Sequence, residues 1–213
     1  MLANTLAAES QNNRWLVMIR PGVHFFDRRS SRDLASLVNS ATFWFWPVAA
    51  TMSRMSDPTS HWPLRKIVSG GQTGVDRAAL DAAIAAGVDH GGWCPQDRLA
   101  EDGPISGVYQ LAETDSARYE VRTRENVADS DATLILCRGP LRGGTRLTQR
   151  IAEEIGKPCL VVDLADDPKV DAVRAWVQEV QPRVLNIAGP RESQCPGVHR
   201  EALAFVARLL AST

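Results

Sequence analysis

Residues 66–87 read KIVSGGQTGVDRAALDAAIAAG, the clearest structural pattern in the chain. A short apolar run is followed by a turn rich in glycine and then by small apolar residues at helical spacing. This order predicts a strand, a tight turn and a helix that ends at Gly87. The glycines of the turn, Gly70, Gly71 and Gly74, leave room for a ligand and tolerate positive φ. Because the free N–H groups and the positive dipole end of the helix face the same turn, we expect an anion to bind there.

The turn matches neither of two common phosphate-binding loops. A P-loop needs a lysine followed by serine or threonine, and Thr73 and Gly74 break the spacing of the dinucleotide fingerprint. If the turn binds a ligand, Gln72, Thr73 and Asp76 are the side chains placed to contact it. The alternative is a tight connection that binds nothing, in which Asp76 only caps the helix and complements its dipole. Both interpretations are open at this point.

The composition is that of a globular protein with room for one α/β domain and extra sequence. The chain has 213 residues, of which 44% are hydrophobic and 23% charged, and its formal net charge is −1. This balance gives no reason to expect a nucleic acid or a membrane as partner. The charge is uneven, because residues 1–63 contain six arginines and four acids, whereas residues 64–213 carry 18 bases and 21 acids.

The cysteines are far apart in the sequence, at Cys94, Cys137, Cys159 and Cys195. They form no Cys-x-x-Cys pair, so we expect neither a zinc site nor a disulfide framework. Cys94 and Cys195 are candidate soft-metal ligands, with an inert buried thiol as the alternative that we favour. Free thiols fit a reducing compartment, and we therefore expect a cytoplasmic protein without a metal site.

Residues 1–63 differ from the rest of the chain. They hold four of the six tryptophans but show no sustained period, with a short strand expected at Trp15–Ile19 and a short helix at Asp33–Val38. The apolar run 41–50 contains a proline and is too short to span a bilayer. We expect residues 1–63 to form a poorly ordered extension, of which residues 1–51 need not belong to the mature protein.

From Leu64 onward the pattern alternates between strands and helices. Further strands are expected at residues 89–95, 131–137, 159–163 and 184–188, and helices at 119–130, 146–155, 168–180 and 199–210, with a polar loop at 96–113. Five successive strand–helix units predict a Rossmann-like, doubly wound α/β domain over residues 64–213. Its five-stranded parallel sheet should have helices on both faces, joined by right-handed crossovers.

Three polar loops follow strands of this sheet, at residues 70–76, 138–145 and 189–197. The carboxyl ends of parallel strands form the ligand crevice in open α/β sheets, so we expect the three loops to converge. The second loop is another glycine turn at a helix start, with Arg142 and Arg146 on either side. Trp93 and Tyr109 are candidates for stacking on a flat ring, although Trp93 also fits the core.

Several motifs together resemble the molybdenum carrier family. They are residues 70–81 (GGQTGVDRAALD), 91–95 (GGWCP), Arg98 with 100–103 (AEDG), 122–127 (RTRENV), 130–133 (SDAT), 143–145 (GGT) and 185–193 (LNIAGPRES). The resemblance covers roughly residues 65–211, and residues 1–63 take no part in it. One departure is Asp97, at a position where the family prefers glycine.

The resemblance implies a Rossmann-like domain that holds molybdenum cofactor, a pterin with a dithiolene and a phosphate. The phosphate would then sit on a glycine-rich helix start, with hydrogen bonds to the pterin edge from Asn126, Asp76 or Asn186. The expected binding residues are Gly70, Gly71, Gln72, Thr73, Gly74, Asp76, Arg98, Glu101, Asp102, Arg122, Asn126, Gly143, Gly144, Thr145, Asn186, Gly189, Arg191, Glu192 and Ser193. By analogy with this fold we also expect a homodimer or homotetramer.

Three functions fit the sequence: a carrier of a phosphorylated pterin or nucleotide-like ligand, an enzyme, and a ligand-sensing scaffold module. The enzyme would be a nucleoside monophosphate phosphoribohydrolase, a class found in the wider lysine-decarboxylase-like group. The glutamate of those enzymes falls at Leu147, which can neither stabilise an oxocarbenium-like centre nor activate water. Glu101, Asp102 or Glu192 could replace it only if the loops brought them in. We therefore favour a carrier without catalytic residues.

Overall fold

The computed structural model describes residues 7–9, 14–18, 23–27 and 62–211, in two compact units, residues 1–56 and 57–213. In the first unit, three strands pair antiparallel in the order β1-β2-β3, at Ala7–Glu9, Arg14–Met18 and Val23–Asp27. Strand β2 overlaps the expected strand at Trp15–Ile19. The expected helix at Asp33–Val38 lies outside the described residues.

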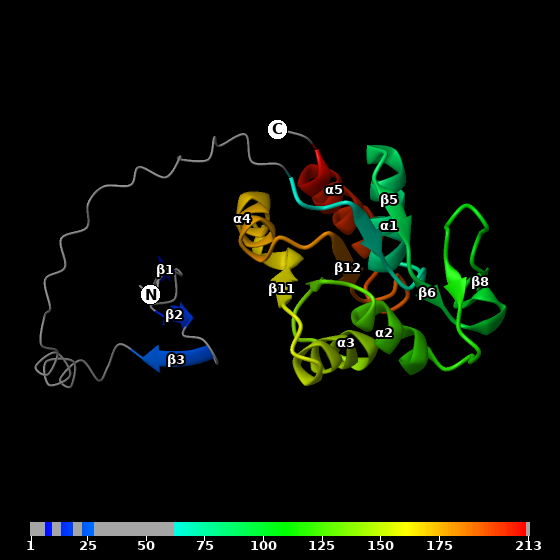
Figure 1. Ribbon diagram of the computed structural model, residues 1–213, viewed down its shortest axis with the longest axis horizontal. Coiled ribbons are helices and arrows are strands. Elements are labelled where there is room, and N and C mark those ends of the chain that lie inside the picture. Colours follow the sequence, from blue (N-terminus) through cyan, green and yellow to red (C-terminus); the bar gives the residue numbers. More distant parts are fainter. Residues whose placement is uncertain (1–6, 10–13, 19–22, 28–61, 212–213) are drawn as a thin grey trace, which may run out of the picture. The chain divides into compact units, whose positions relative to one another are not determined.

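The second unit is built on a five-stranded parallel sheet, which confirms the predicted fold class (Figure 1). Its strand order is β11-β10-β12-β4-β5. The strands are β4 Lys66–Val68, β5 Asp89–Gly91, β10 Ala132–Cys137, β11 Cys159–Asp163 and β12 Val184–Ala188. Strand β12, the last in the sequence, therefore lies between β10 and β4 in the middle of the sheet.

Helices cover both faces of this sheet (Figure 1). On one face, helices α1 (Val75–Ala86), α4 (Val170–Val180) and α5 (Val198–Leu210) share an apolar core with the sheet. Phe205 of α5 and Ile67 of β4 are among its fully buried side chains. On the other face, α2 (Tyr119–Ala128) packs against α3 (Gly143–Glu154) through the buried residues Val127, Ile151 and Ala152.

Two predicted elements differ clearly from the structure, while ends of the elements expected at 119–130, 131–137, 168–180 and 199–210 shift by only one or two residues. The expected strand at 89–95 is two strands, β5 and β6 (Trp93–Cys94), because Gly92 between them has a φ of +126°. Helix α3 begins at Gly143, three residues earlier than expected. The glycines had suggested a break in the chain, whereas here they form the first turn of the helix.

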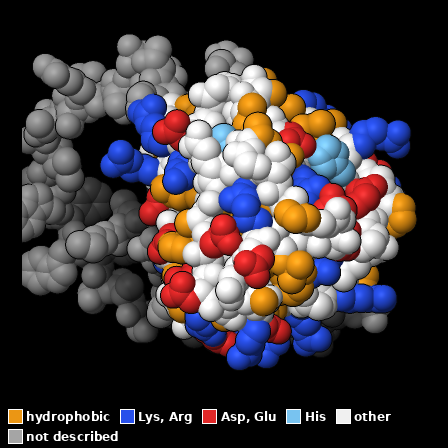
Figure 2. Space-filling view, turned by 90° about the vertical axis from the view of Figure 1, so that its right-hand side faces the viewer, with side chains coloured by type: hydrophobic (Ala, Val, Ile, Leu, Met, Phe, Trp, Pro, Cys, Tyr) orange, Lys and Arg blue, Asp and Glu red, His pale blue; other side chains and the backbone are white. Residues whose placement is uncertain are grey.

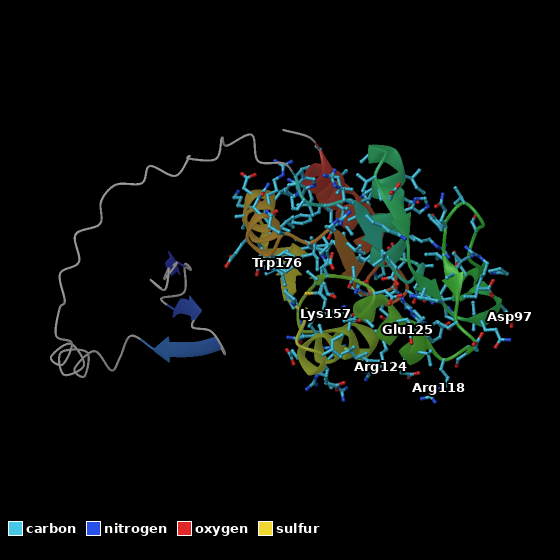
Figure 3. All side chains as sticks on the ribbon, viewed as in Figure 1. Asp97, Arg118, Arg124, Glu125, Lys157 and Trp176 are labelled. Carbon is cyan, nitrogen blue, oxygen red and sulfur yellow. The ribbon has the colours of Figure 1, made fainter. Side chains whose placement is uncertain are left out.

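The expected polar loop at 96–113 contains local structure. It holds the short strands β7 (Leu99–Ala100) and β8 (Gly103–Pro104), which pair with each other, and β9 (Ala112–Glu113), which pairs with β6. Asp97 has a φ of +60°, a conformation that favours glycine and explains why glycine would suit this position. Figure 3 shows Asp97 in the β8 region, far from Arg124 on α2.

Two further observations concern the distribution of side chains on the surface of this unit and the length and polarity of its helices. On the face shown in Figure 2, basic and acidic side chains are interspersed and apolar side chains are scattered in small groups. Among the described residues, no helix is both long enough and apolar enough to cross a membrane.

Deleting residues 1–56 should leave the second unit folded, because the described residues that form its buried core all belong to this unit. We expect the Tm measured by calorimetry to change by less than about 3 °C, or about 1 kcal/mol for a domain of this size. Trp62 packs against the core, so a deletion that also removes Trp62 should lower the Tm further. A large fall in Tm on deleting residues 1–56 alone would contradict the prediction.

Candidate functional site

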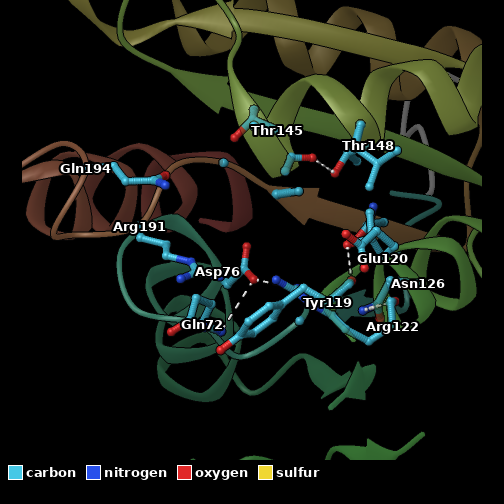
Figure 4. A pocket seen from close by; sticks show the side chains of 18 of the residues that line it. Gln72, Asp76, Tyr119, Glu120, Arg122, Asn126, Thr145, Thr148, Arg191 and Gln194 are labelled. Carbon is cyan, nitrogen blue, oxygen red and sulfur yellow. Dashed lines mark hydrogen bonds and ion pairs between the residues drawn. The ribbon is translucent and has the colours of Figure 1, made fainter. Parts of the chain in front are cut away.

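A cavity of about 490 Å³ opens at the carboxyl edge of the sheet (Figure 4). It is lined by the turn after β4, by α2, by the first two turns of α3, and by the end of β12 with the loop that follows it. The predicted convergence of loops at this edge is therefore seen in the structure. The loop after β10 leads to α3 on one face, whereas the loop after β12 leads to α5 on the other, so the sheet is open between them.

Many of the residues expected to bind a ligand line this cavity. They are Gly70, Gln72, Asp76, Arg122, Asn126, Gly143, Gly144, Thr145, Asn186, Gly189 and Arg191. The other expected residues lie outside its wall, namely Gly71, Thr73, Gly74, Arg98, Glu101, Asp102, Glu192 and Ser193. The structure gives most of the second group a role in holding loops together.

The start of helix α3 is open toward the cavity. No described side chain caps this helix, and its first turn contains no acidic residue. Gly143 and Gly144 have no described atom within 4 Å of the position that a Cβ would take. The first N–H groups of a helix have no partner within the helix, so this turn offers both free donors and the positive end of the dipole.

The start of helix α1, where the sequence predicted an anion, is instead closed by the chain itself. The amide of Val75 donates to the carbonyl of Pro190 at 3.2 Å, and the carboxylate of Asp76 accepts from the amide of Gln72 at 3.4 Å. Asp76 therefore supplies the negative charge at this helix start. A Cβ on Gly71 would meet the side chain of Leu111 at 2.5 Å, so this glycine permits close packing and does not face the cavity.

A buried ion pair crosses the cavity from α1 to α2. Arg122 Nη1 lies 2.9 Å from Asp76 Oδ2, and the two side chains are only 14% and 5% exposed. Gly70 makes this contact possible, because a Cβ there would lie 1.3 Å from the same arginine nitrogen. Leaving one partner of such a pair buried alone costs about 3–5 kcal/mol.

Arg191 lies on the ring of Tyr119, with its guanidinium carbon 4.5 Å from the ring centroid. Both side chains line the cavity (Figure 4). Tyr119 is thus the aromatic residue at the site, whereas the candidates from the sequence, Trp93 and Tyr109, lie outside the cavity wall. The hydroxyl of Tyr109 instead donates to Asp81 at 2.8 Å, and burial together with this bond raises the pKa of Tyr109 to about 12.

Sequence reasoning missed several residues of the wall, namely Tyr119, Glu120, Thr148 and Gln194, and it favours a solvated face for Arg150, which also lines the cavity. Helical spacing could have found some of them, because residues three or four apart share a face of a helix. Tyr119 lies three residues before Arg122, and Arg150 lies three after Leu147, which also lines the cavity. Of the two arginines expected beside the second turn, Arg142 lines a neighbouring cavity and Arg146 lines neither.

Glu101 joins two loops outside the cavity. Its carboxylate accepts hydrogen bonds from the hydroxyl of Thr73 and from both the amide and the hydroxyl of Ser193. Burial raises the pKa of Glu101, but the bonds from Ser193 and Thr73 outweigh it, so the pKa is lowered overall. Asp102 pairs with Arg77, and this hydrogen bond lowers the pKa of Asp102. Both carboxylates are therefore occupied in tying loops together.

Glu192 and Arg98 also act within the chain. The carboxylate of Glu192 accepts from the amides of His199 and Gly197 at the start of α5, and these bonds lower its pKa. Arg98 donates to the backbone carbonyls of four residues in the loop after β8, namely Ile105, Ser106, Tyr109 and Leu111. These contacts stabilise the loops around the site without reaching the cavity.

The two asparagines of the wall differ in how much of their hydrogen-bonding capacity is used within the chain. Asn126 bonds to both the amide and the carbonyl of Trp93, each at 2.8 Å, and to the carbonyl of Arg122 at 2.9 Å. It thereby attaches α2 to strand β6. Asn186 donates to the hydroxyl of Thr133 at 3.3 Å inside the sheet. Asn126 has therefore little capacity left to bind a ligand.

The cysteines lie apart from this cavity. Cys137 and Cys195 line the neighbouring cavity of about 480 Å³, and Cys94 is fully buried. Burial raises the pKa of each of the four thiols, to about 11 for Cys137 and Cys159. Within the described part of the chain, no group of three or more histidine, cysteine, aspartate or glutamate side chains is arranged to hold a metal ion.

Gly74→Ala should destabilise the protein strongly, because Gly74 has a φ of +78° and a Cβ there would lie 2.4 Å from the carbonyl oxygen of Pro190. The control is Gly87→Ala, in the left-handed helical conformation (φ +66°, ψ +24°) and with no described atom within 4 Å, whereas Gly74 has a ψ of −129° that also disfavours alanine. The control should cost about 1 kcal/mol from backbone strain alone. We expect at least about 2 kcal/mol more for Gly74→Ala in denaturant unfolding. Equal losses in the two variants would contradict this reading of the close contact.

Comparisons with known proteins agree with the α/β fold described above. The model of the circularly permutated YpsA SLOG family matches residues 67–210. A crystal structure of a putative molybdenum carrier protein from Syntrophus aciditrophicus is 44% identical, with a TM-score of 0.67, over 70% of this chain and 96% of that protein. No curated protein matches the chain. The resemblance to the molybdenum carrier family that the sequence motifs indicate is confirmed, and the chain belongs to the circularly permutated YpsA SLOG family.

Proposed function

We propose that this protein binds a small phosphorylated molecule with a flat ring in the cavity at the carboxyl edge of the sheet. The observation that carries the proposal is the uncapped start of α3, which faces a cavity of about 490 Å³. Cavities of this size are typical of sites for small molecules and cofactors. The crystal structure that resembles this chain is described as a molybdenum carrier, which supports the same kind of role.

The phosphate would bind at the first turn of α3. Gly143 and Gly144 leave their backbone N–H groups accessible, and Thr145 adds a hydroxyl in the same wall. Helix starts of this kind bind phosphate through free donors and the helix dipole. Arg150 and Arg191 also line the cavity, so positive charge is available near a bound anion.

The ring would lie near Tyr119. The guanidinium carbon of Arg191 already lies over this ring, which supports the placement of a flat group there. A flat heterocycle could take the place of the guanidinium or lie beside it, since aromatic rings stack on one another favourably. Phosphorylated pterins and nucleotides both combine a phosphate with a ring of this kind.

Molybdenum cofactor is a candidate cargo, and the residues of the cavity fit two of its three parts. The start of α3 suits its phosphate, and the region of Tyr119 suits its pterin. No cysteine is found among the residues that line this cavity, so no thiolate is offered to the metal. The chain would therefore hold such a cofactor through its phosphate and its ring.

Binding without hydrolysis fits the acidic groups of the site best. Leu147 and the next residue, Thr148, both line the cavity, and neither is a carboxylate. Glu101, Asp102 and Glu192, the possible substitutes, lie outside the wall and are engaged elsewhere. Asp76 is paired with Arg122, which leaves exposed Glu120 as the other acid of the wall.

The variant Gly144→Glu tests the phosphate site. Its control is Gly144→Gln, whose side chain has nearly the same shape but carries no charge. Both side chains have room, and a carboxylate in the first turn stabilises a helix, so the Tm of the Glu variant should not fall below that of the Gln variant. The carboxylate would compete with a bound phosphate. We expect calorimetry to show at least tenfold weaker binding of pyrophosphate and of GMP to the Glu variant than to the Gln variant, about 1.4 kcal/mol. Equal affinities, or no binding to the wild type, would contradict the proposal.

The wild type should release no free base from AMP or GMP above background, even at high enzyme concentration, because Leu147 stands where the catalytic carboxylate is needed. Chromatography of the products over several hours measures this. A Glu120→Gln variant that is expressed and purified in the same way is the control for contaminating activity. Turnover that is robust in the wild type and lost in Glu120→Gln would favour a phosphoribohydrolase over a carrier.

A further inference from the structure

The side chain of Gln72 has a defined orientation at the Asp76 end of the cavity. Its Oε1 accepts hydrogen bonds from two backbone amides, that of Thr73 at 3.2 Å and that of Glu101 at 2.9 Å. Only an oxygen can accept both bonds, so the usual ambiguity between the oxygen and the nitrogen of a glutamine is removed. The amide nitrogen Nε2 must therefore be on the other side of the group.

This Nε2 has no hydrogen-bond partner among the described residues, although Gln72 is 97% buried and lines the cavity. A second buried nitrogen, Arg122 Nε, lacks a described partner in the same way. The two residues lie close together, because the backbone amide of Gln72 and Nη1 of Arg122 both bond to Asp76 Oδ2. Figure 4 shows Gln72 and Arg122 on either side of Asp76.

A buried donor without an acceptor costs about 1–3 kcal/mol. Buried polar groups in folded proteins are nearly always paired, so an unpaired one calls for an explanation. Two of the three such side-chain atoms in the described part of the chain are donors, and both of these belong to residues of the cavity wall. Neither nitrogen has exposed surface in the described structure, so a ligand atom that accepts hydrogen bonds would satisfy them after a small shift of the two side chains toward the cavity.

We propose that Gln72, together with Arg122 Nε, recognises a hydrogen-bond acceptor on the ring of the ligand, such as a lactam carbonyl. This rests on the proposed function and adds a second point of recognition, apart from the phosphate at α3. Pterin and guanine share an amino-lactam pyrimidine ring whose carbonyl is such an acceptor. Adenine has an amino group, which is a donor, at the corresponding position. The site therefore selects lactam rings over amino-substituted ones.

Discrimination of this kind can be large. A buried donor that meets a carbonyl gains a hydrogen bond, whereas one that meets an amino group leaves two donors facing each other without acceptors. GMP and AMP are therefore suitable probes, because both carry the phosphate and differ in the ring. We expect the wild type to bind GMP at least tenfold more tightly than AMP.

Gln72→Glu is the sharpest variant, because it keeps the oxygen that accepts from Thr73 and Glu101 and replaces only Nε2 by a second oxygen. A carboxylate oxygen accepts hydrogen bonds, so it repels the carbonyl of GMP and suits the amino group of AMP. We expect the ratio of GMP affinity to AMP affinity to fall at least tenfold in this variant. The ratio cancels the general effect of the added charge on phosphate binding, and pyrophosphate affinity reports that effect separately.

Calorimetry with the three probes on the full chain separates the outcomes. A preference for GMP in the wild type that falls or reverses in Gln72→Glu supports the proposal. Equal binding of GMP and AMP by the wild type, an unchanged ratio in Gln72→Glu, or GMP binding no tighter than pyrophosphate would overturn it while leaving the phosphate site intact. If the wild type binds none of the three probes, the proposed function itself fails, and this inference fails with it.

Gln72→Glu could lose stability beside Asp76, and Arg122→Lys provides an independent measurement. Lysine keeps a positive charge for Asp76 but has no Nε–H of the guanidinium type. A folded Arg122→Lys protein should also show a smaller preference for GMP over AMP. A preference as large as in the wild type would exclude Arg122 Nε from the recognition of the ring.

Discussion

The buried pair of Asp76 and Arg122 is the interaction on which the site depends. Asp76 belongs to the first turn of α1 on one face of the sheet, and Arg122 belongs to α2 on the other. The pair therefore connects the two helical layers across the carboxyl edge. It also determines the positions of Gln72 and of the turn after β4, because the same carboxylate oxygen accepts from the backbone of Gln72. Gly70 must lack a side chain for this arrangement to exist.

The two glycine turns of the domain use glycine for different physical purposes. In the turn after β4, the glycines let other parts of the chain approach closely: Arg122 at Gly70, Leu111 at Gly71 and the loop after β12 at Gly74. At the start of α3, Gly143 and Gly144 have open space around them. The first turn is filled by the protein, and the second is available to a ligand. The same residue type thus closes one helix start and leaves another open.

The charged side chains of the site also fall into two groups, those bonded within the surrounding loops and those that line the cavity. The carboxylates of Glu101, Asp102 and Glu192 are bonded within the loops around the cavity, where they hold the strand ends in place. The guanidinium of Arg191 lies on an aromatic ring, and the side chain of Arg150 also lines the cavity. These three acidic groups therefore serve the framework, whereas cations and backbone donors line the space where an anion would bind, together with Glu120 and the paired Asp76. This arrangement is the basis of our proposal that the protein holds a ligand and does not cleave it.

The sequence by itself determined the five strand–helix units, the parallel sheet and the edge at which the loops meet, because these follow from apolar periodicity and from the handedness of crossovers. It also placed residues such as Arg122 and Gly144 near the site. Only the tertiary structure decided which glycine turn is open, since that depends on contacts with Leu111 and Pro190, far along the chain. It likewise showed that Asn126 is occupied by Trp93 and that Gln72 has an unpaired donor. Hydrogen-bond partners between distant segments are set by packing, which local patterns do not record.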